Sequence, residues 1–117
     1  MVRPDGYGLW VEGDRTIAFL LEYDNGTEPL ARLADKLPRY GRLFAAKGTC
    51  IWVLFSFPGP RREAQARRVL AHPGVPVATA VVGPGDSSAD ALWLPVGDCE
   101  GRRRLIDLGD PSPRLAQ

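Results

Sequence analysis

The chain has 117 residues, which is enough for one domain with its own hydrophobic core and too few for two. Hydrophobic residues make up 44% and charged residues 25%, the balance of an ordinary globular protein, so disorder of the whole chain is excluded. The 15 basic and 14 acidic residues give a net charge of +1, so the chain lacks the strong overall positive charge typical of a nucleic-acid-binding domain.

No membrane or secretory signal is visible in the sequence. The longest apolar run, 50–57, is far shorter than the roughly 20 residues of a membrane-spanning helix. The N-terminus, Met-Val-Arg-Pro-Asp, has no apolar segment of the kind found in a signal peptide. Two cysteines, Cys50 and Cys99, are too few for a disulfide framework or a zinc site. These features predict a cytoplasmic protein.

The N-terminal part of the chain predicts a β-hairpin. Residues 8–12 and 16–24 are rich in β-branched and aromatic residues, and glycine-containing turns separate and end them. Side chains alternate across a strand, so Glu22 and Asp24 share one face with Leu20. Two carboxylates are therefore predicted at the end of an otherwise apolar strand.

A helix is predicted to follow, from residue 27 or 28 to residue 47, with Pro29 in its first turn. The residues expected to form its buried stripe are Leu30, Leu33, Leu37 and Phe44. Lys36 and Tyr40, four residues apart, lie on the margin of that stripe. Pro38 costs about 3 kcal/mol in a helix interior, which predicts a kink or two short helices.

The remaining elements complete an alternation of strands and helices. We predict a central strand covered on both faces at 50–57, a helix at 60–71, strands at 75–82 and 91–96, and a further short strand at 104–108. Residues 1–109 are expected to form the domain, and the proline-rich residues 110–117 a flexible tail. The β-β-α-β-α-β order predicts an α/β fold with a mixed sheet flanked by helices.

Three carboxylates could carry chemistry. Asp5 precedes the first strand, and Glu22 and Asp24 end the second. A carboxylate on a half-buried strand is costly unless it is paired, solvated or bound to a cation, and such oxygens suit Mg²⁺. Lys36 could reach the same place and offset negative charge. The alternatives are a turn at Asp5, a solvated strand end, and a Lys36 side chain that extends over the apolar stripe.

At these residues the sequence resembles a known family. The segments that carry the resemblance are Arg3-Pro4-Asp5-Gly6, residues 19–28, Lys36-Leu37 and Tyr40. They are similar to the C-terminal domain of the actinobacterial replication-relaxation proteins, which are associated with plasmids and other mobile elements. That domain in turn is similar to the PD-(D/E)XK nuclease fold, a mixed sheet flanked by helices.

The resemblance implies a catalytic site made of Asp5, Glu22, Asp24 and Lys36, in which Asp5 and Glu22 ligate Mg²⁺ or Mn²⁺. Asp24 stands where the family's acid-x-Lys motif has its lysine, and Lys36 is the candidate replacement. In this reading Asp24 orients a metal-bound water or a basic partner. The full-length proteins of this family look as though they carry an N-terminal DNA-binding winged helix. This sequence has none, so we expect it to be an excised domain or a short relative.

Two functions follow from the resemblance. The first is a metal-dependent DNA nuclease-like domain that processes plasmid or mobile-element DNA. The second is a catalytically inactive nuclease-fold module that binds DNA or protein or forms a homodimer. Apart from the resemblance, a third interpretation is a small-molecule-binding domain unrelated to DNA. The residues expected to contact DNA are Tyr40, Arg61, Arg62, Arg67 and Arg68.

Overall fold

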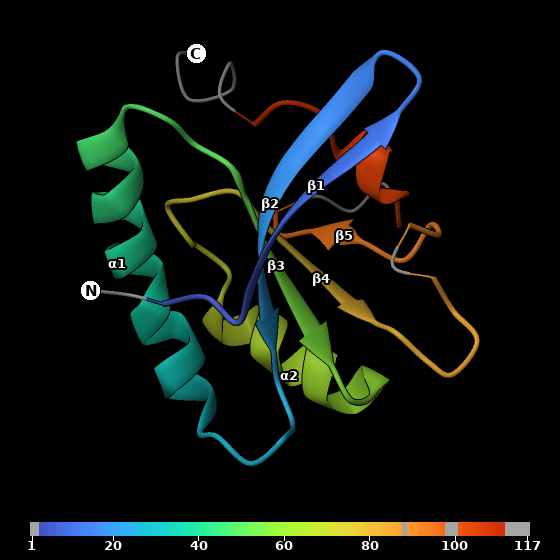
Figure 1. The fold of residues 1–117 in the computed structure, drawn as a ribbon. Helices are drawn as coiled ribbons and strands as arrows, with labels where there is room; N and C mark the ends of the chain where they lie inside the picture. Colours follow the sequence, from blue (N-terminus) through green and yellow to red (C-terminus); the bar gives the residue numbers. More distant parts are fainter. Residues whose placement is uncertain (1–2, 88, 98–100, 112–117) are drawn as a thin grey trace.

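A β-hairpin, three further strands, two α-helices and a short 3₁₀ helix build the molecule (Figure 1), and the computed structural model describes residues 3–87, 89–97 and 101–111. The strands are β1 (Gly6–Glu12), β2 (Arg15–Tyr23), β3 (Trp52–Phe57), β4 (Val77–Val81) and β5 (Leu94–Pro95). The helices are α1 (Leu30–Lys47), α2 (Pro60–Val69) and the short 3₁₀ helix Leu105–Leu108. The predicted α/β class is confirmed.

The five strands form one mixed sheet in the order β1-β2-β3-β4-β5. The β1–β2 and β4–β5 pairs are antiparallel, whereas β2–β3 and β3–β4 are parallel and are each connected through a helix. Parallel neighbours need such a crossover because the chain must return to the end of the sheet at which the first strand began. The described residues thus form the mixed, helix-flanked sheet that the sequence predicts.

The hairpin is tight because of one glycine. A Cβ atom at Gly8 would lie only 2.4 Å from Cζ of Phe19, the residue paired with Gly8 across the hairpin. Absence of a side chain at Gly8 therefore allows the Phe19 ring to lie over β1. The hairpin begins two residues earlier than the sequence predicts, at Gly6.

Helix α1 runs through Pro38 as one continuous helix, so the prediction of two short helices is wrong. Its buried side chains are Leu33, Leu37, Tyr40 and Phe44. Their packing on the sheet outweighs the propensity cost of Pro38, which is exposed on the outer side. The helix starts at Leu30, with Pro29 just before it, and Gly48 in left-handed conformation (φ 68°) ends it.

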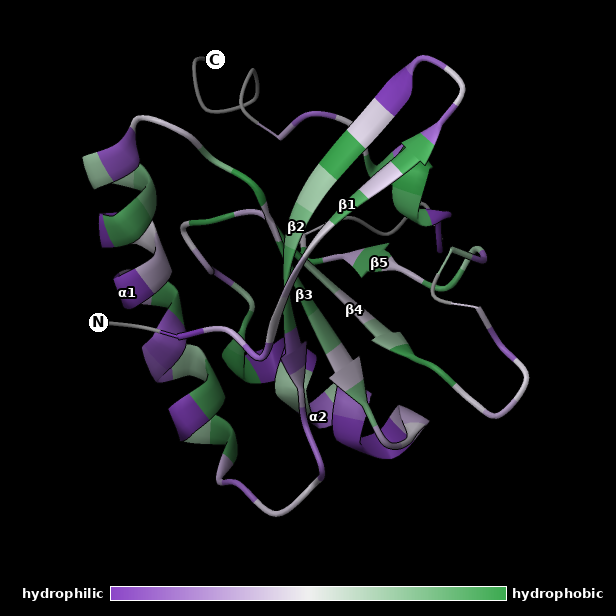
Figure 2. Cartoon of the chain, in the orientation of Figure 1, coloured by the Kyte–Doolittle hydropathy of each residue, from purple (hydrophilic) through white to green (hydrophobic). Residues whose placement is uncertain are grey.

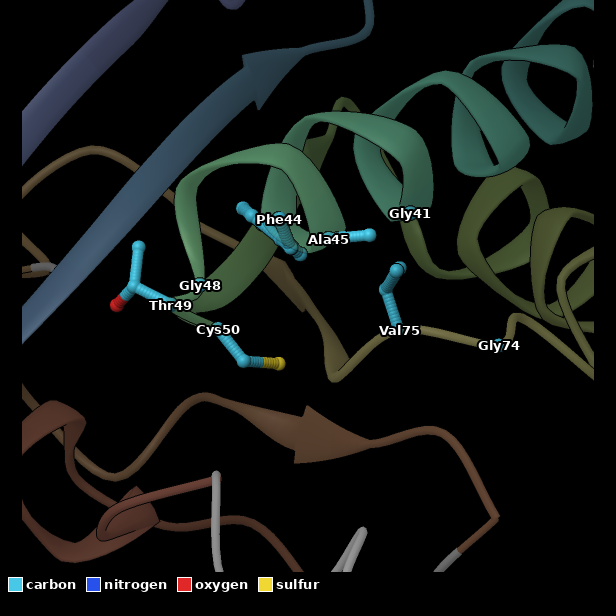
Figure 3. A pocket seen from close by; sticks show the side chains of 8 residues that line it. All are labelled: Gly41, Phe44, Ala45, Gly48, Thr49, Cys50, Gly74 and Val75. Atoms are coloured by element: carbon cyan, nitrogen blue, oxygen red, sulfur yellow. The ribbon is translucent and has the colours of Figure 1, made fainter.

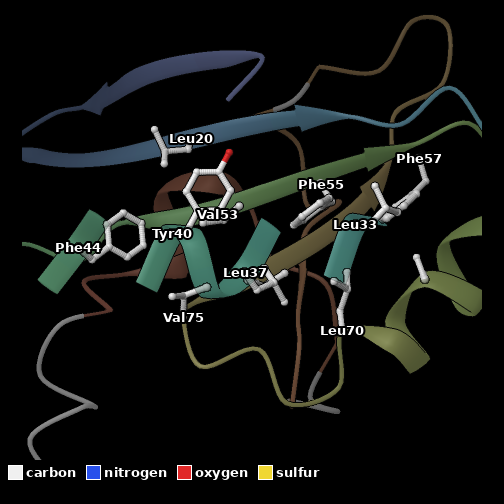
Figure 4. Close-up of a cluster of buried hydrophobic side chains, with 12 residues drawn as sticks. Leu20, Leu33, Leu37, Tyr40, Phe44, Val53, Phe55, Phe57, Leu70 and Val75 are labelled. Carbon is white, nitrogen blue, oxygen red and sulfur yellow. The ribbon is translucent and has the colours of Figure 1, made fainter. Parts of the chain in front are cut away.

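Strand β3 is buried on both faces, as its unbroken apolar run predicts. Val53, Phe55 and Phe57 face the helices and pack with residues of β2, α1 and α2, including Leu20, Tyr40 and Phe44 (Figure 4). Trp52 and Leu54 face the opposite side of the sheet. A strand with two apolar faces must be covered twice, and two different parts of the chain do this.

The C-terminal part of the described chain covers the second face. Trp93, Leu105, Ile106 and Leu108 are buried there, and Nε1 of Trp52 donates a hydrogen bond to the Gly109 carbonyl at 2.8 Å. The predicted strand at 104–108 is wrong because these residues form the 3₁₀ helix, which buries three of its four side chains. The predicted strand at 91–96 is shortened to Leu94–Pro95 and a single bridge between Trp93 and Arg103.

Some predictions lie partly outside the described residues. Of the tail predicted at 110–117, only residues 110 and 111 are described, and residues 112–117 lie outside the described part of the chain. Cys99 also lies outside it. Cys50 is half-buried. Among the helices of the described part, none has the length and apolar character needed to cross a bilayer.

Candidate functional site

Glu22 lies at the C-terminal end of β2, on the face covered by α1, with only 2% of its surface exposed. Nζ of Lys36 donates to Oε1 of Glu22 at 2.9 Å, and the Tyr40 hydroxyl donates to Oε2. Lys36 and Tyr40 are one helical turn apart on α1, so they reach the carboxylate together. Both oxygens of Glu22 are therefore engaged by side chains of the neighbouring helix.

The protonation states of the two donors follow from this environment. Burial raises the pKa of Tyr40, and the hydrogen bond to Glu22 and its negative charge raise it further. Burial alone would lower the pKa of Lys36, but the hydrogen bond and charge of Glu22 outweigh it and the pKa is raised. Tyr40 thus stays a neutral donor and Lys36 a cation at neutral pH.

Asp24 is the second buried carboxylate, and Arg62 of α2 binds it in a bidentate manner. Nε of Arg62 lies 2.8 Å from Oδ2, and the second guanidinium contact to Oδ1 measures 2.9 Å. The Gly26 amide also donates to Oδ2 at 3.2 Å, and Arg62 donates to the Glu28 carbonyl. A planar fork of this kind fixes α2 against the end of β2.

Asp5 is exposed, unlike the other two carboxylates. Its Oδ2 accepts a hydrogen bond from the Tyr23 amide at 2.8 Å, next to the end of β2. The hydrogen bond to Tyr23 holds Asp5 at the same end of β2 as Glu22, and its negative charge also helps to raise the pKa of Lys36. The structure therefore brings the predicted catalytic residues to one end of β2.

The residues present do not fit a divalent cation. Glu22 is bound by an ammonium group and a hydroxyl, and Asp24 by a guanidinium, so a divalent cation would have to compete with these groups for the carboxylate oxygens. Within the described residues, no group of three or more acidic, histidine or cysteine side chains could hold a metal. No buried side-chain nitrogen or oxygen there lacks a hydrogen-bond partner either.

The residues predicted to contact DNA are divided between surface and interior. Tyr40 is fully buried, and Arg62 is bound to Asp24. Arg67 donates to the Thr79 hydroxyl at 2.9 Å and to the carbonyls of β5 at 2.7 and 2.9 Å. Arg61 and Arg68 are exposed. Arg61 and Arg68 could therefore bind a partner directly, whereas Arg62 and Arg67 would first have to break their hydrogen bonds within the domain.

Sequence reasoning missed a third ion pair, between the buried Glu63 of α2 and the exposed Arg102. The guanidinium contacts both carboxylate oxygens at 2.8 and 2.9 Å, and the Thr79 hydroxyl donates to Glu63 at 2.7 Å. The signal was present, because Glu63 shares helical spacing with the buried Ala66 and Leu70. This network holds the C-terminal segment against α2 and β4.

Another hollow lies between the end of α1 and the segment before β4 (Figure 3). Its volume is about 340 Å³, and its lining is Gly41, Phe44, Ala45, Gly48, Thr49, Cys50, Gly74 and Val75. Cys50 is the only titratable residue in this lining, and burial raises its pKa, which keeps it a thiol. The lining offers no group suited to acid–base or nucleophilic chemistry.

The N-terminal part of the chain matches a known family. Residues 1–51 match the family described as replication-relaxation, a segment that contains β1, β2 and α1 and the residues around Glu22. The match covers 51 of the 117 residues and supports, over that segment, the resemblance seen in the sequence. Neither the curated proteins nor the solved structures include a significant match to the chain.

Proposed function

We propose that this domain is a DNA-binding module in the replication or processing of a plasmid or other mobile element, with a nuclease-like fold but no metal-dependent cleavage of its own. The observation that carries the proposal is the state of Glu22, which is buried with both carboxylate oxygens bound by Lys36 and Tyr40. The similarity of residues 1–51 to the replication-relaxation family supports the DNA-related role.

Charge balance at the end of β2 argues against a metal site. Each buried carboxylate has its own cation, Lys36 for Glu22 and Arg62 for Asp24. A divalent ion would have to displace the Lys36 ammonium or sit beside it, where like charges repel. Hydrolysis in a metal-dependent nuclease depends on the ion to activate water and stabilise the phosphate charge. Side chains already neutralised inside the domain are poorly prepared for that task.

The test is a nicking assay on supercoiled plasmid with Mg²⁺ or Mn²⁺, run beside DNA binding measured by fluorescence anisotropy. We expect the wild type to bind DNA with an affinity that falls as salt rises, and to leave the plasmid intact. Calorimetric titration with Mn²⁺ should give no difference between the wild type and Glu22→Gln. Metal-dependent nicking that both Asp5→Asn and Glu22→Gln abolish would overturn the non-catalytic part of the proposal.

The metal-dependent nuclease remains the competing proposal, and one observation favours it. Asp5, Glu22 and Lys36 lie at one edge of the sheet, close enough for the charge of Asp5 to influence Lys36. An active state of this kind requires Lys36 to release Glu22 when substrate binds. The same nicking assay separates the two proposals, with Asp14→Asn as the control because Asp14 is an exposed carboxylate in the turn between β1 and β2.

A second candidate function is self-association through β1. This strand is at the edge of the sheet, and its side chains Tyr7, Leu9 and Val11 are each at least 60% exposed. Edge strands are normally protected by lysine, proline or a bulge, and β1 contains neither lysine nor proline. Antiparallel pairing of two β1 strands about Leu9 would place Tyr7 of each copy opposite Val11 of the other. The occupant we propose is therefore a second copy of this chain.

Sedimentation velocity over a range of concentrations tests this association. The wild type should form a dimer at high concentration, and Leu9→Lys should remain a monomer because it places like charges opposite each other at the centre of the pair. The matched control is Val69→Lys, which changes an exposed apolar residue on α2 instead. A monomeric wild type at all concentrations would contradict this role.

A further inference from the structure

Helix α1 carries most of the unbalanced positive charge of the domain. Its 18 residues include five basic and one acidic side chain, whereas the net charge of the whole chain is only +1. Hydrophilic residues recur along its length in Figure 2. Four of the five basic side chains are exposed, and we call the three arginines among them the α1 basic face: Arg32, Arg39 and Arg42.

The helical repeat gathers these side chains on one side. At 3.6 residues per turn, Arg32, Arg39 and Arg42 fall within about 80° around the helix axis and span about 15 Å along it. Lys47, at the end of the helix, falls about 60° from Arg32 on the side of Leu33 and Tyr40, so it lies outside this row. The buried stripe that begins with Leu33 faces the sheet instead. The α1 basic face is therefore a row directed toward solvent.

These cations are not used inside the domain. In the part of the chain that the structure describes, the basic residues in salt bridges include Arg15, Lys36, Arg62, Arg102 and Arg104. None belongs to the α1 basic face. Exposed cations without an internal partner remain available to a polyanion, and binding to them costs no buried ion pair.

The comparison with α2 makes the assignment specific. Helix α2 has four arginines, but Arg62 and Arg67 direct their guanidinium groups inward to Asp24, Thr79 and the β5 carbonyls. Of the four arginines on α2, only Arg61 and Arg68 are exposed. The sequence alone cannot distinguish an arginine that points inward from one that is exposed. For this reason it predicts DNA contacts for all four arginines of α2.

We infer that the α1 basic face binds the sugar–phosphate backbone of DNA, and that α2 contributes little. The inference rests on the proposed DNA-binding function and names the surface that performs it. Arginine suits this task because its planar guanidinium binds phosphate oxygens in a bidentate manner. Such contacts position DNA without reading its sequence, so the binding should depend strongly on salt and weakly on sequence.

One acidic residue lies within the row and allows a test of opposite sign. Asp35 is exposed between Arg32 and Arg39, and together with Glu28 and Lys36 these residues surround a hollow of about 300 Å³. A carboxylate beside bound phosphate repels it. Removing the Asp35 charge should therefore strengthen binding, whereas removing the arginines should weaken it.

Fluorescence anisotropy with a short DNA duplex, titrated over roughly 50 to 200 mM salt, tests the inference. The variants are Arg39→Gln/Arg42→Gln on α1 and the matched control Arg61→Gln/Arg68→Gln on α2, each pair two exposed arginines on a helix. We expect the α1 pair to lower affinity about tenfold or more and to reduce the salt slope by about 1.8, from about 0.9 per lost phosphate contact. The α2 pair should leave both unchanged, and Asp35→Asn should raise affinity several-fold.

The outcomes separate the surface from the function. A wild type that binds DNA, with the α2 pair rather than the α1 pair reducing affinity, would overturn the inference and leave the proposed function intact. A wild type that binds no DNA at low salt would overturn both. Unfolding in urea, expected to be within about 0.5 kcal/mol of wild type for these surface variants, excludes loss of structure as the cause.

Discussion

Glu22 shows how one residue can suggest two different functions. A carboxylate at the end of an apolar strand is a good metal ligand, but it is also a good anchor for a cation from the next helix. The structure places Lys36 and Tyr40 on Glu22, so the carboxylate connects β2 to α1. A carboxylate in this state contributes to stability, and its removal should be costly.

Replacement of Glu22 with glutamine should lower the free energy of unfolding by about 1–3 kcal/mol, since two hydrogen bonds to a charged acceptor weaken. Lys36→Met should cost more, about 3–5 kcal/mol, because it leaves a buried carboxylate without its cation. Asp35→Asn is the control and should change stability by less than about 0.5 kcal/mol. Urea denaturation measures all three. A metal site crowded with negative charge would give the opposite sign for Glu22→Gln.

The same cluster predicts how stability responds to alkaline pH. Folding raises the pKa of both Tyr40 and Lys36. Above about pH 10 an unfolded tyrosine loses its proton while the folded Tyr40 keeps it, so the unfolded state binds fewer protons and stability falls. The stabilisation is fully present below about pH 10 and is lost as pH rises further.

Tyr40→Phe isolates this effect. The variant loses the hydroxyl, so its free energy of unfolding should decline less steeply with pH than that of the wild type between about pH 9 and 11. Urea unfolding at a series of pH values gives both slopes. The exposed Tyr7 provides the control, because Tyr7→Phe should leave the slope unchanged. Equal slopes for the wild type and Tyr40→Phe would contradict a buried, protonated Tyr40.

Among the elements, α1 shows where local preference yields to packing. Pro38 cannot donate a backbone hydrogen bond, yet the helix continues through it because the side chains of the buried stripe pack against the sheet. Pro38→Ala should raise the free energy of unfolding by about 1–3 kcal/mol, since the exposed ring leaves few contacts to lose. Pro29→Ala should give no comparable gain, because a residue just before the helix needs no such hydrogen bond. A fall in stability for Pro38→Ala in thermal or urea unfolding would show that the ring itself is required.

The elements that the sequence predicted well have a clear period or a long apolar run. The hairpin, β3 and the buried face of α1 belong to this group. The secondary structure of the C-terminal segment was predicted poorly because its burial is irregular. Trp93, Leu105 and Leu108 are buried through contacts with residues distant in sequence. No local pattern carries that information.

The candidate site was predictable only in part, for a related reason. The alternation of β2 placed Glu22 and Asp24 on the helix-covered face, and helical spacing placed Lys36 beside Tyr40. The partner of Asp24 is Arg62, 38 residues away and across the parallel crossover. Which arginine of a cluster points inward depends on tertiary packing, so the sequence could not divide Arg62 and Arg67 from Arg61 and Arg68.

At the scale of the whole molecule, the two sheet faces have different uses. The 3₁₀ helix and Trp93 cover one face, whereas α1 and α2 cover the other and leave β1 exposed beyond α1. Tyr7 pairs with Leu20, a residue of the helix-covered face, so the exposed β1 stripe lies on the same side as α1. The α1 basic face and the proposed dimer edge therefore belong to one side of the sheet.

This shared side predicts that dimerisation strengthens DNA binding. Two β1 strands paired antiparallel keep corresponding faces together, so a dimer would place two α1 basic faces on one side of a continuous sheet. A duplex long enough to reach both should bind with greater apparent affinity, because the second contact is intramolecular. Leu9→Lys, which prevents the pairing, should match the wild type on a short duplex and bind the long duplex more weakly. Val69→Lys serves as the control for the added positive charge. The measurement is a set of anisotropy titrations with duplexes of increasing length. A higher affinity of the wild type than of Leu9→Lys that appears only beyond a certain length supports the dimer. Identical curves for the wild type and Leu9→Lys at every length would exclude a role of the β1 edge in DNA binding.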